Sequence, residues 1–253
     1  MTNGLTLLDD VRAHVQSRLP SAAPIVVPFE NAAGLVLAAD ITAPENVPPF
    51  DNTAVDGYAV RAADTASAPC ELRVTGEMAA GAQHVATVEP GTAVRIMTGA
   101  PLPAGCDAIV MVEDTEHAGE SSVRINRSVS PGDGIRRAGS DVVKGDVPLR
   151  AGTVATAAVQ AVLSTVNARA VSVWPRPRVG VISTGDELVD DGSPLQPGQI
   201  RESNRTMLMR LVSEAGAEAV DLRIVRDDEA ELESVLRTAV NNDGIDVLVT
   251  SGG

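Results

Sequence analysis

One segment, residues 178–188, restricts most strongly what this chain can fold into. Its residues 179–182 are apolar or small and predict a short buried strand, which breaks just before the adjacent carboxylates of Asp186 and Glu187. In an open parallel sheet, ligands bind outside the carboxyl ends of the strands. Two acids at such an end can hold a divalent cation or accept a proton from a substrate. The simpler alternative is that Thr184 and Asp186 only cap a turn or a helix.

The sequence after this segment alternates between strands and helices. Two further strands and two helices with one apolar face are predicted, at residues 219–225 and 245–250 and at about 204–215 and 232–240. This alternation predicts a parallel sheet with right-handed crossovers. Asp227, Asp228 and Ser251 follow the two later strands, so we expect acids, a hydroxyl and glycine backbone at one edge of the sheet.

The start of the first of these helices is a second candidate binding feature. Ser203 or Asn204 is expected to cap the helix, with Arg201 and Arg205 near its positive end. Such a terminus favours a phosphate or an oxyanion, whereas the alternative is a helix cap with no further role.

The composition argues against several classes of partner and site. Thirty-four acidic residues against 20 basic ones give a net charge of −14 and a pI near 4.6, which disfavours nucleic acid and anionic membranes. One Trp, one Tyr and two Phe are too few for base stacking. The His and Cys residues are isolated, so zinc and a Ser-His-Asp triad lack support. No segment has the pattern of a membrane span or a signal peptide, so we expect a cytoplasmic protein.

The N-terminal half follows different patterns. A helix with an apolar stripe is predicted near its start, suited to packing or to a subunit contact, with Leu8, Val11, Val15 and Leu19 on that stripe. Residues 44–59 form a proline-rich polar loop, which fits either recognition or an interdomain connector. Residues 60–127 contain strand signals only, at 71–75, 92–97, 108–113 and 122–126.

Two loops in this half carry polar candidates. Residues 97–105 are rich in Gly and Pro and offer Thr98 as their one side-chain hydroxyl, although such a loop can simply turn the chain. Arg136 and Arg137 come shortly before Asp141. A double arginine in so acidic a chain is a candidate anion contact, or it only neutralises neighbouring carboxylates.

Five motifs and the last four residues, taken together, resemble the molybdopterin molybdenumtransferase family, the MoeA-like proteins. The motifs are PPFDNTAVDGYAV (48–60), RIMTGAPLPAGCDAIV (95–110), IRRAGSDV (135–142), VGVISTGDEL (179–188), IRESNRTML (200–208) and the terminal TSGG. They occur in order, and the resemblance as a whole spans about residue 5 to the last residue.

The resemblance implies an activity and an architecture. Adenylylated molybdopterin and molybdate would give molybdenum cofactor and AMP, with Mg²⁺, and the related molybdopterin adenylyltransferase would act upstream. The implied fold is α/β and β: an elongated N-terminal dimerisation domain (1–47 and 131–175), an inserted β domain (48–130) and a molybdopterin-binding α/β domain (176–253). The implied assembly is a homodimer in which the β domain of one subunit covers the α/β domain of the other.

The resemblance also places functional residues. The implied catalytic positions are Asp56, Thr98, Asp141, Glu187 and Asp227. The implied metal ligands are Asp186, Glu187, Asp227 and Asp228. The implied cofactor-binding positions are Thr184, Gly185, Asn204, Ser251, Gly252 and Gly253. Asp227 also fits a helix cap and Asp228 with Glu231 fits a capping box, so part of this acid cluster is expected to stabilise a helix.

Two other functions stay open at this stage. The adenylyltransferase shares the α/β domain and the TSGG loop, but it resembles that domain alone. A non-catalytic dimeric scaffold would retain the fold as a binding platform. The chain ends where the family continues with the rest of the α/β domain, so we expect these 253 residues to be an incomplete protein whose activity alone is doubtful.

Overall fold

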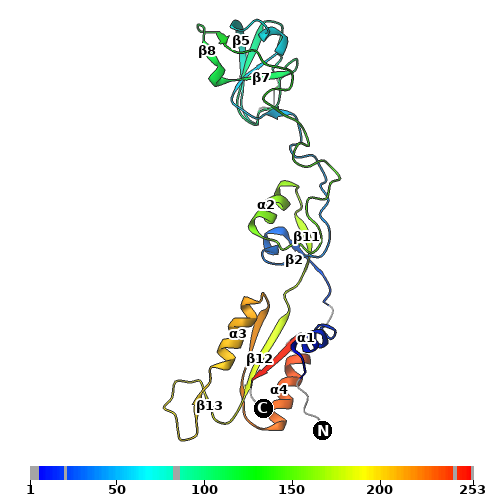
Figure 1. The fold of residues 1–253 in the computed structure, drawn as a ribbon, viewed down its shortest axis with the longest axis vertical. Coiled ribbons are helices and arrows are strands. Elements are labelled where there is room, and N and C mark those ends of the chain that lie inside the picture. The colour runs from blue at the N-terminus through cyan, green and yellow to red at the C-terminus, as the bar shows by residue number, and fades with distance from the viewer. Residues whose placement is uncertain (1–5, 20–21, 82–85, 242–243, 252–253) are drawn as a thin grey trace. The chain divides into compact units, whose positions relative to one another are not determined.

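The computed structural model describes residues 6–19, 22–81, 86–241 and 244–251. The chain divides into two compact units (Figure 1). The first comprises Met1–Ala39, Ala151–Ala157 and Ala170–Gly253, and the second comprises Asp40–Arg150 and Ala158–Arg169. The finer division into three domains that the resemblance implies stays a prediction.

The second unit is built on a six-stranded sheet. Its strands lie in the order β7-β4-β6-β5-β9-β8, and only the β5–β6 pair is parallel. They are β4 (Gly57–Val60), β5 (Cys70–Met78), β6 (Thr92–Ile96), β7 (Ala108–Met111), β8 (Thr115–His117) and β9 (Ser122–Ile125). Four were predicted from the sequence. β4 was missed because all four of its residues are buried, which leaves no alternation to read, and β8 has only three residues.

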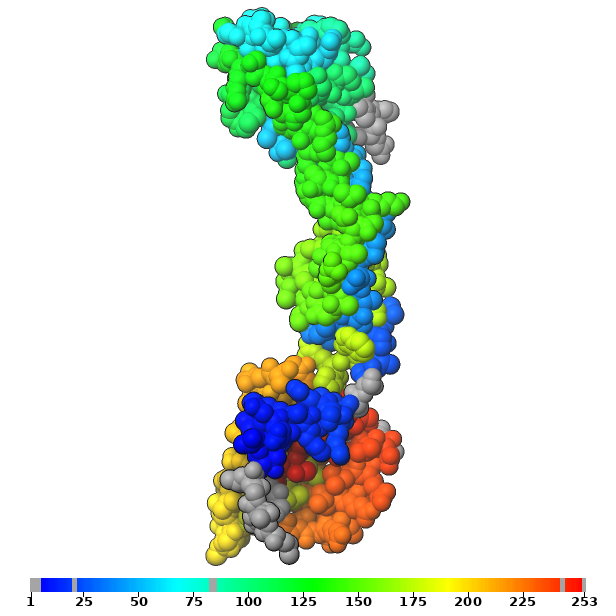
Figure 2. All heavy atoms as spheres, turned by 45° about the vertical axis from the view of Figure 1, so that its right-hand side comes forward, coloured from blue at the N-terminus to red at the C-terminus, as the bar shows by residue number. Residues whose placement is uncertain are grey.

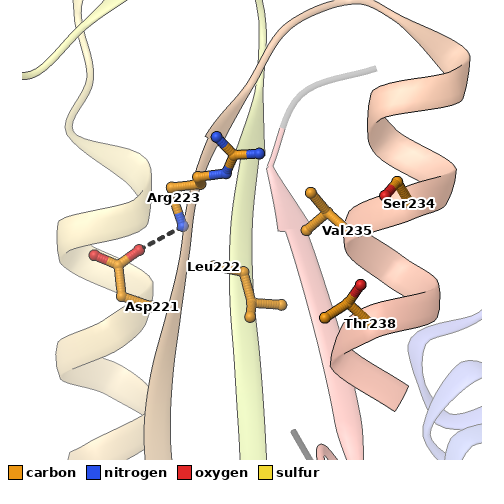
Figure 3. A pocket seen from close by; sticks show the side chains of 6 residues that line it. All are labelled: Asp221, Leu222, Arg223, Ser234, Val235 and Thr238. Carbon is orange, nitrogen blue, oxygen red and sulfur yellow. Dashed lines mark hydrogen bonds between the residues drawn. The ribbon is translucent and has the colours of Figure 1, made fainter. Parts of the chain in front are cut away.

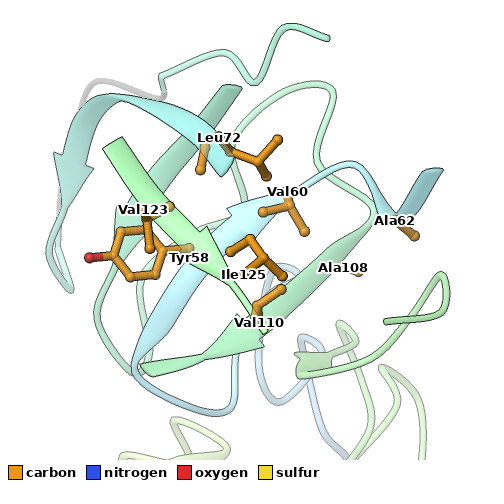
Figure 4. Packing of buried hydrophobic residues seen from close by; sticks show 9 residues of the cluster. Tyr58, Val60, Ala62, Leu72, Ala108, Val110, Val123 and Ile125 are labelled. Atoms are coloured by element: carbon orange, nitrogen blue, oxygen red, sulfur yellow. The ribbon is translucent and has the colours of Figure 1, made fainter. Parts of the chain in front are cut away.

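Successive residues of this sheet enter two separate apolar clusters. Tyr58, Val60 and Val110 belong to one cluster (Figure 4), whereas Ala59 and Ile109 belong to the other. This is the two-residue period of a strand. Because both faces are covered, the sheet holds its connecting loops on a rigid scaffold.

The first unit contains a small antiparallel sheet and an α/β part. The small sheet has the order β1-β11-β2, from β1 (Ile25–Pro28), β11 (Ala170–Trp174) and β2 (Val36–Leu37). The remaining short elements of the chain are η1 (Phe29–Ala32), β3 (Asn52–Thr53), η2 (Ala62–Thr65), η3 (Val112–Asp114), β10 (Ile135–Arg136) and α2 (Ala157–Thr165).

The α/β part is a three-stranded parallel sheet in the order β15-β12-β16. Its elements are β12 (Arg178–Thr184), α3 (Asn204–Glu214), β15 (Glu218–Val225), α4 (Glu229–Asn241) and β16 (Val247–Ser251), with a short parallel pair, β13 (Leu188–Val189) and β14 (Ile200–Arg201), between β12 and α3. The predicted α/β fold class and parallel sheet are confirmed.

The helices α3 and α4 cover opposite faces of this sheet. The carboxylate of Asp221 on β15 bonds Arg205 of α3, whereas the next residue, Leu222, packs in a cluster with Ala239 of α4. Consecutive residues of a strand point to opposite faces. Ile182 at the centre of β12 is fully buried in the α4 cluster.

The helix α1 (Leu8–Gln16) has no buried residue, and its surface is open in the space-filling view (Figure 2). Its predicted apolar stripe is present but exposed, with Leu8, Val11 and Val15 at 63%, 43% and 52%. None of the helices that the structure describes has the length and apolar character needed to cross a membrane.

Candidate functional site

A polar cavity of about 150 Å³ lies at the carboxyl end of β12. Its walls come from the end of β12, the β13–β14 pair, the start of α3 and the end of β16. The polar residues that line it are Thr184, Glu187, Arg201, Glu202, Ser203, Asn204 and Ser251. Four of these, Thr184, Glu187, Asn204 and Ser251, are site residues predicted from the sequence.

The parallel register brings these residues together. Ser183 of β12 pairs with Ser251 of β16, and Thr184 pairs with Val225 of β15. The side-chain amide of Asn204 donates a hydrogen bond to Ser251 Oγ at 3.0 Å, which ties the start of α3 to the end of β16. Three strand ends and one helix start therefore meet at one edge, as ligand-binding parallel sheets arrange them.

The carboxylate of Glu187 lies where only a glycine at position 185 leaves room for it. Gly185 has φ +150°, and a Cβ on this residue would lie 2.4 Å from Glu187 Oε2. The side chain of Glu187 therefore folds back against the backbone at the strand break. Within the described residues, no hydrogen bond or ion pair involves this carboxylate, so its oxygens are available to a ligand.

The start of α3 is capped differently from our expectation. Ser203 is the N-cap residue, but its side chain makes no capping hydrogen bond, and Asn204 bonds Ser251 instead. Glu202 takes the role: its Oε1 accepts the backbone N–H of Arg205 at 2.7 Å and the hydroxyl of Ser183 at 3.0 Å. Glu202 was not predicted from the sequence as a site residue. An acidic residue just before a predicted helix start was the available signal.

The other predicted acids of this unit do not line the cavity. Asp228 Oδ1 accepts the backbone N–H of Glu231 at 2.8 Å, so Asp228 caps α4, as the alternative interpretation held. Asp186 and Asp227 are also not among the residues that line the cavity, although β12 and β15, the strands that precede them, pair directly. Gly252 and Gly253 lie outside the described residues. Within those residues, no group of three or more His, Cys, Asp or Glu side chains lies close enough to hold a metal ion.

Asp56 and Thr98, both in the second unit, are in direct contact. Asp56 Oδ1 accepts the backbone N–H and the hydroxyl of Thr98, each at 2.7 Å. These two bonds hold the pKa of Asp56 below its usual value, the hydroxyl bond contributing most. Thr53 exchanges backbone bonds with the same loop, so two segments predicted separately form one structural feature.

The double arginine binds neighbouring carboxylates. Arg136 forms an ion pair with Asp141, and Arg137 bonds Asp51 Oδ2 at 2.5 Å. Backbone N–H donation from Ala138 and the Arg137 guanidinium keep the pKa of Asp51 below its usual value. The neutralising alternative thus describes the contacts of both arginines.

A larger cavity of about 360 Å³ lies between β15 and α4 in the first unit (Figure 3). Its charged lining residues are Asp221 and Arg223, and Asp221 Oδ1 accepts the backbone N–H of Arg223 at 2.7 Å. Arg223 has φ +66° where β15 carries one residue more than β12. Because Asp221 already bonds this backbone and Arg205, the smaller cavity at the strand ends is the better binding site.

The fold and the cavity define a class: an α/β binding domain, with its site outside the carboxyl ends of a parallel sheet, carried by a chain with a separate β-rich unit. Comparison with known proteins identifies the family. Residues 6–167 match the family model of the MoeA N-terminal region (domain I and II), and residues 180–253 match the model described as "Probable molybdopterin binding domain". The chain belongs to the MoeA family.

Curated relatives and solved structures agree with this assignment. Molybdopterin molybdenumtransferase 2 of Mycobacterium tuberculosis is 46% identical over 244 residues, which cover 94% of this chain and 59% of the relative. Molybdopterin molybdenumtransferase of Haemophilus influenzae is 38% identical, with 97% and 60% covered. The crystal structure of a molybdopterin biosynthesis MoeA protein of Pyrococcus horikoshii OT3 superposes with a TM-score of 0.88 at 34% identity, covering 99% of this chain and 67% of that one. The chain thus spans about 60% of the length of these curated relatives.

The contact between Gly185 and Glu187 gives a first testable prediction. Gly185→Ala should displace the Glu187 carboxylate, because the new Cβ would lie 2.4 Å from Oε2. Gly192→Ala is the matched control, since Gly192 also has positive φ, +78°, but open space around it. Both changes are expected to cost about 1–3 kcal/mol of backbone strain. Crystal structures of the two variants would show the shift, and an unmoved Glu187 in Gly185→Ala would contradict this account.

The Asp56–Thr98 contact predicts a pH effect. Thr98→Val removes the hydroxyl donor and keeps the backbone N–H, so the pKa of Asp56 should rise toward the ordinary aspartate value. A carboxyl with a lowered pKa stabilises the fold above its unfolded-state pKa, and this contribution is lost as the pH falls through the lowered value. An NMR titration of the Asp56 carboxyl carbon measures the shift. Thr115→Val is the control, because within the described residues the Thr115 hydroxyl bonds the carbonyl of Val112 and no carboxylate.

Proposed function

We propose that this protein acts in molybdenum cofactor biosynthesis, where it inserts molybdate into adenylylated molybdopterin and releases AMP. The observation that carries the proposal is the cavity at the end of β12, which lies within the residues that match the molybdopterin-binding family model. Curated relatives 34% to 46% identical are named molybdopterin molybdenumtransferase, which supports a transferase.

The residues around the cavity suit an anionic, hydrogen-bonding ligand. Arg201 and the N-terminus of α3 favour a phosphate group. Asn204 and Ser251 supply an amide and a hydroxyl that fix orientation. In the proposed reaction, water or a molybdate oxygen attacks the adenylyl phosphorus. The phosphoanhydride bond breaks with the pterin phosphate as leaving group, and AMP carries the oxygen that attacked.

Magnesium belongs to the proposal as a resident cation. Mg²⁺ keeps several waters and is commonly held by one or two carboxylates together with substrate phosphates, so a site without three protein acids fits it. Glu187 lines the cavity with its carboxylate unoccupied and is the first proposed ligand. A second would come from Asp186, Asp227 or Asp228, the other proposed ligands, which do not line the cavity. When bound, the cation would neutralise charge on the phosphate.

We also propose that the protein is a homodimer and that molybdopterin adenylyltransferase supplies its substrate. The exposed apolar stripe of α1 supports a subunit contact, because a helix with an apolar face gains stability by burying it. The proposed dimer would combine Asp56 and Thr98 of one subunit with Glu187 of the other.

Molybdate-dependent release of AMP tests the function. The purified full-length protein should release AMP from adenylylated molybdopterin only when Mg²⁺ and molybdate are both present. Glu187→Ala should lower the rate by on the order of 10²-fold or more, because a carboxylate at the reacting group is lost. Glu214→Ala, at the exposed end of α3, should leave the rate unchanged. AMP release that does not depend on molybdate would favour adenylyl-transfer chemistry. A folded protein that releases no AMP would favour a scaffold.

Mixing inactive variants tests the dimeric site. If Asp56 of one subunit serves Glu187 of the other, equal amounts of Asp56→Ala and Glu187→Ala chains should restore about a quarter of the sites through random pairing. A site built within one subunit would restore none. Activity of the mixture, after subunit exchange is verified by mass spectrometry of tagged chains, distinguishes the two arrangements.

A further inference from the structure

Two charged side chains at the cavity, Glu202 in its wall and Arg205 at the start of α3, are buried and incompletely paired. The side chain of Glu202 is 1% exposed and that of Arg205 is 12% exposed. Glu202 Oε2 and Arg205 Nε have no hydrogen-bond partner among the residues that the structure describes. These two atoms lie 4.0 Å from each other, so the orphan acceptor and the orphan donor belong to one ion pair.

The remaining contacts of the pair reach several segments around the cavity. Glu202 Oε1 accepts bonds from Ser183, at the end of β12, and from the backbone of Arg205, at the start of α3. The Arg205 guanidinium also bonds Asp190, just after β13, and donates to Asp221 of β15 at 2.6 Å. The pair therefore ties β12, the β13 segment, α3 and β15 together at one point.

We propose that Glu202, acting through Ser183 and Arg205, is a positioning residue that holds the start of α3 in register with the ends of β12 and β16. Its place in catalysis rests on the proposed function of the cavity. Asn204 reaches Ser251 only while the first turn of α3 keeps its position, and Glu202 fixes that turn through the Arg205 N–H. The charge is needed because a neutral amide would turn an N–H toward the donor Nε of Arg205.

Glu202→Gln tests the proposal, with Glu214→Gln as the matched control. Glu214 pairs with Arg210 on the same helix, but both side chains are more than half exposed. Hydrogen exchange should quicken roughly tenfold at the Arg205 backbone amide in Glu202→Gln, and the Asn204 side-chain amide resonances should shift toward solvent values, while the control changes neither. The affinity for AMP should fall by roughly tenfold, the lower end of the effect of losing a supporting partner.

Each outcome decides the proposal. The proposal is overturned if Glu202→Gln changes neither the exchange rate of the Arg205 amide nor the Asn204 side-chain resonances. It is also overturned if these change while the AMP affinity does not, because the pair would then stabilise the helix without positioning the site. Should Glu202→Gln fail to fold, Ser183→Ala removes one donor to Oε1 and should give the same shifts at smaller size. If the wild-type protein neither binds nor releases AMP, the proposed function is wrong. The Arg205 exchange rate and the Asn204 resonances would still show whether Glu202 positions α3.

Discussion

The parallel pairing of β12 with β15 on one side and β16 on the other is the constraint on which the candidate site depends. Val181 and Ile182 are fully buried, and consecutive strand residues face opposite sides of the sheet. A slip of one residue would reverse these faces, so the core fixes the register. Because that register aligns Ser183 with Ser251 and Thr184 with Val225, core packing also decides where the polar residues after each strand lie.

Stability alone does not account for the buried charges of Glu202 and Arg205. Replacing a buried ion pair with well-packed apolar residues is often neutral or stabilising, whereas removing one partner leaves a costly buried charge. Glu202 and Arg205 nevertheless lie at the junction of a strand end and a helix start, where backbone N–H groups need acceptors. Their directional bonds specify a geometry that apolar packing would leave free. Such a geometry keeps Asn204 next to Ser251 at the cavity.

The sequence predicted the α/β part well because its signals are local. The alternation of apolar strands with amphipathic helices is readable residue by residue, and the parallel sheet follows from it. Four predicted site residues meet at one cavity because strand ends of such a sheet converge. The capping of α3 was predicted wrongly, since Ser203 is the usual residue type but Glu202 is held in place by Ser183, a contact between residues 19 positions apart. The buried strand β4 was missed because it shows no alternation.

The predicted carboxylates differ in how much of their hydrogen-bonding capacity the fold already uses. Asp228 is a helix cap, Asp141 pairs with Arg136, and Asp56 holds Thr98 through Oδ1 alone. A cation or a donor from a substrate needs free carboxylate oxygens. Among the described acids, Glu187 combines an unoccupied carboxylate with a place on the cavity wall, where Gly185 leaves room for it. Glu187 is therefore the carboxylate whose position ligand chemistry explains best.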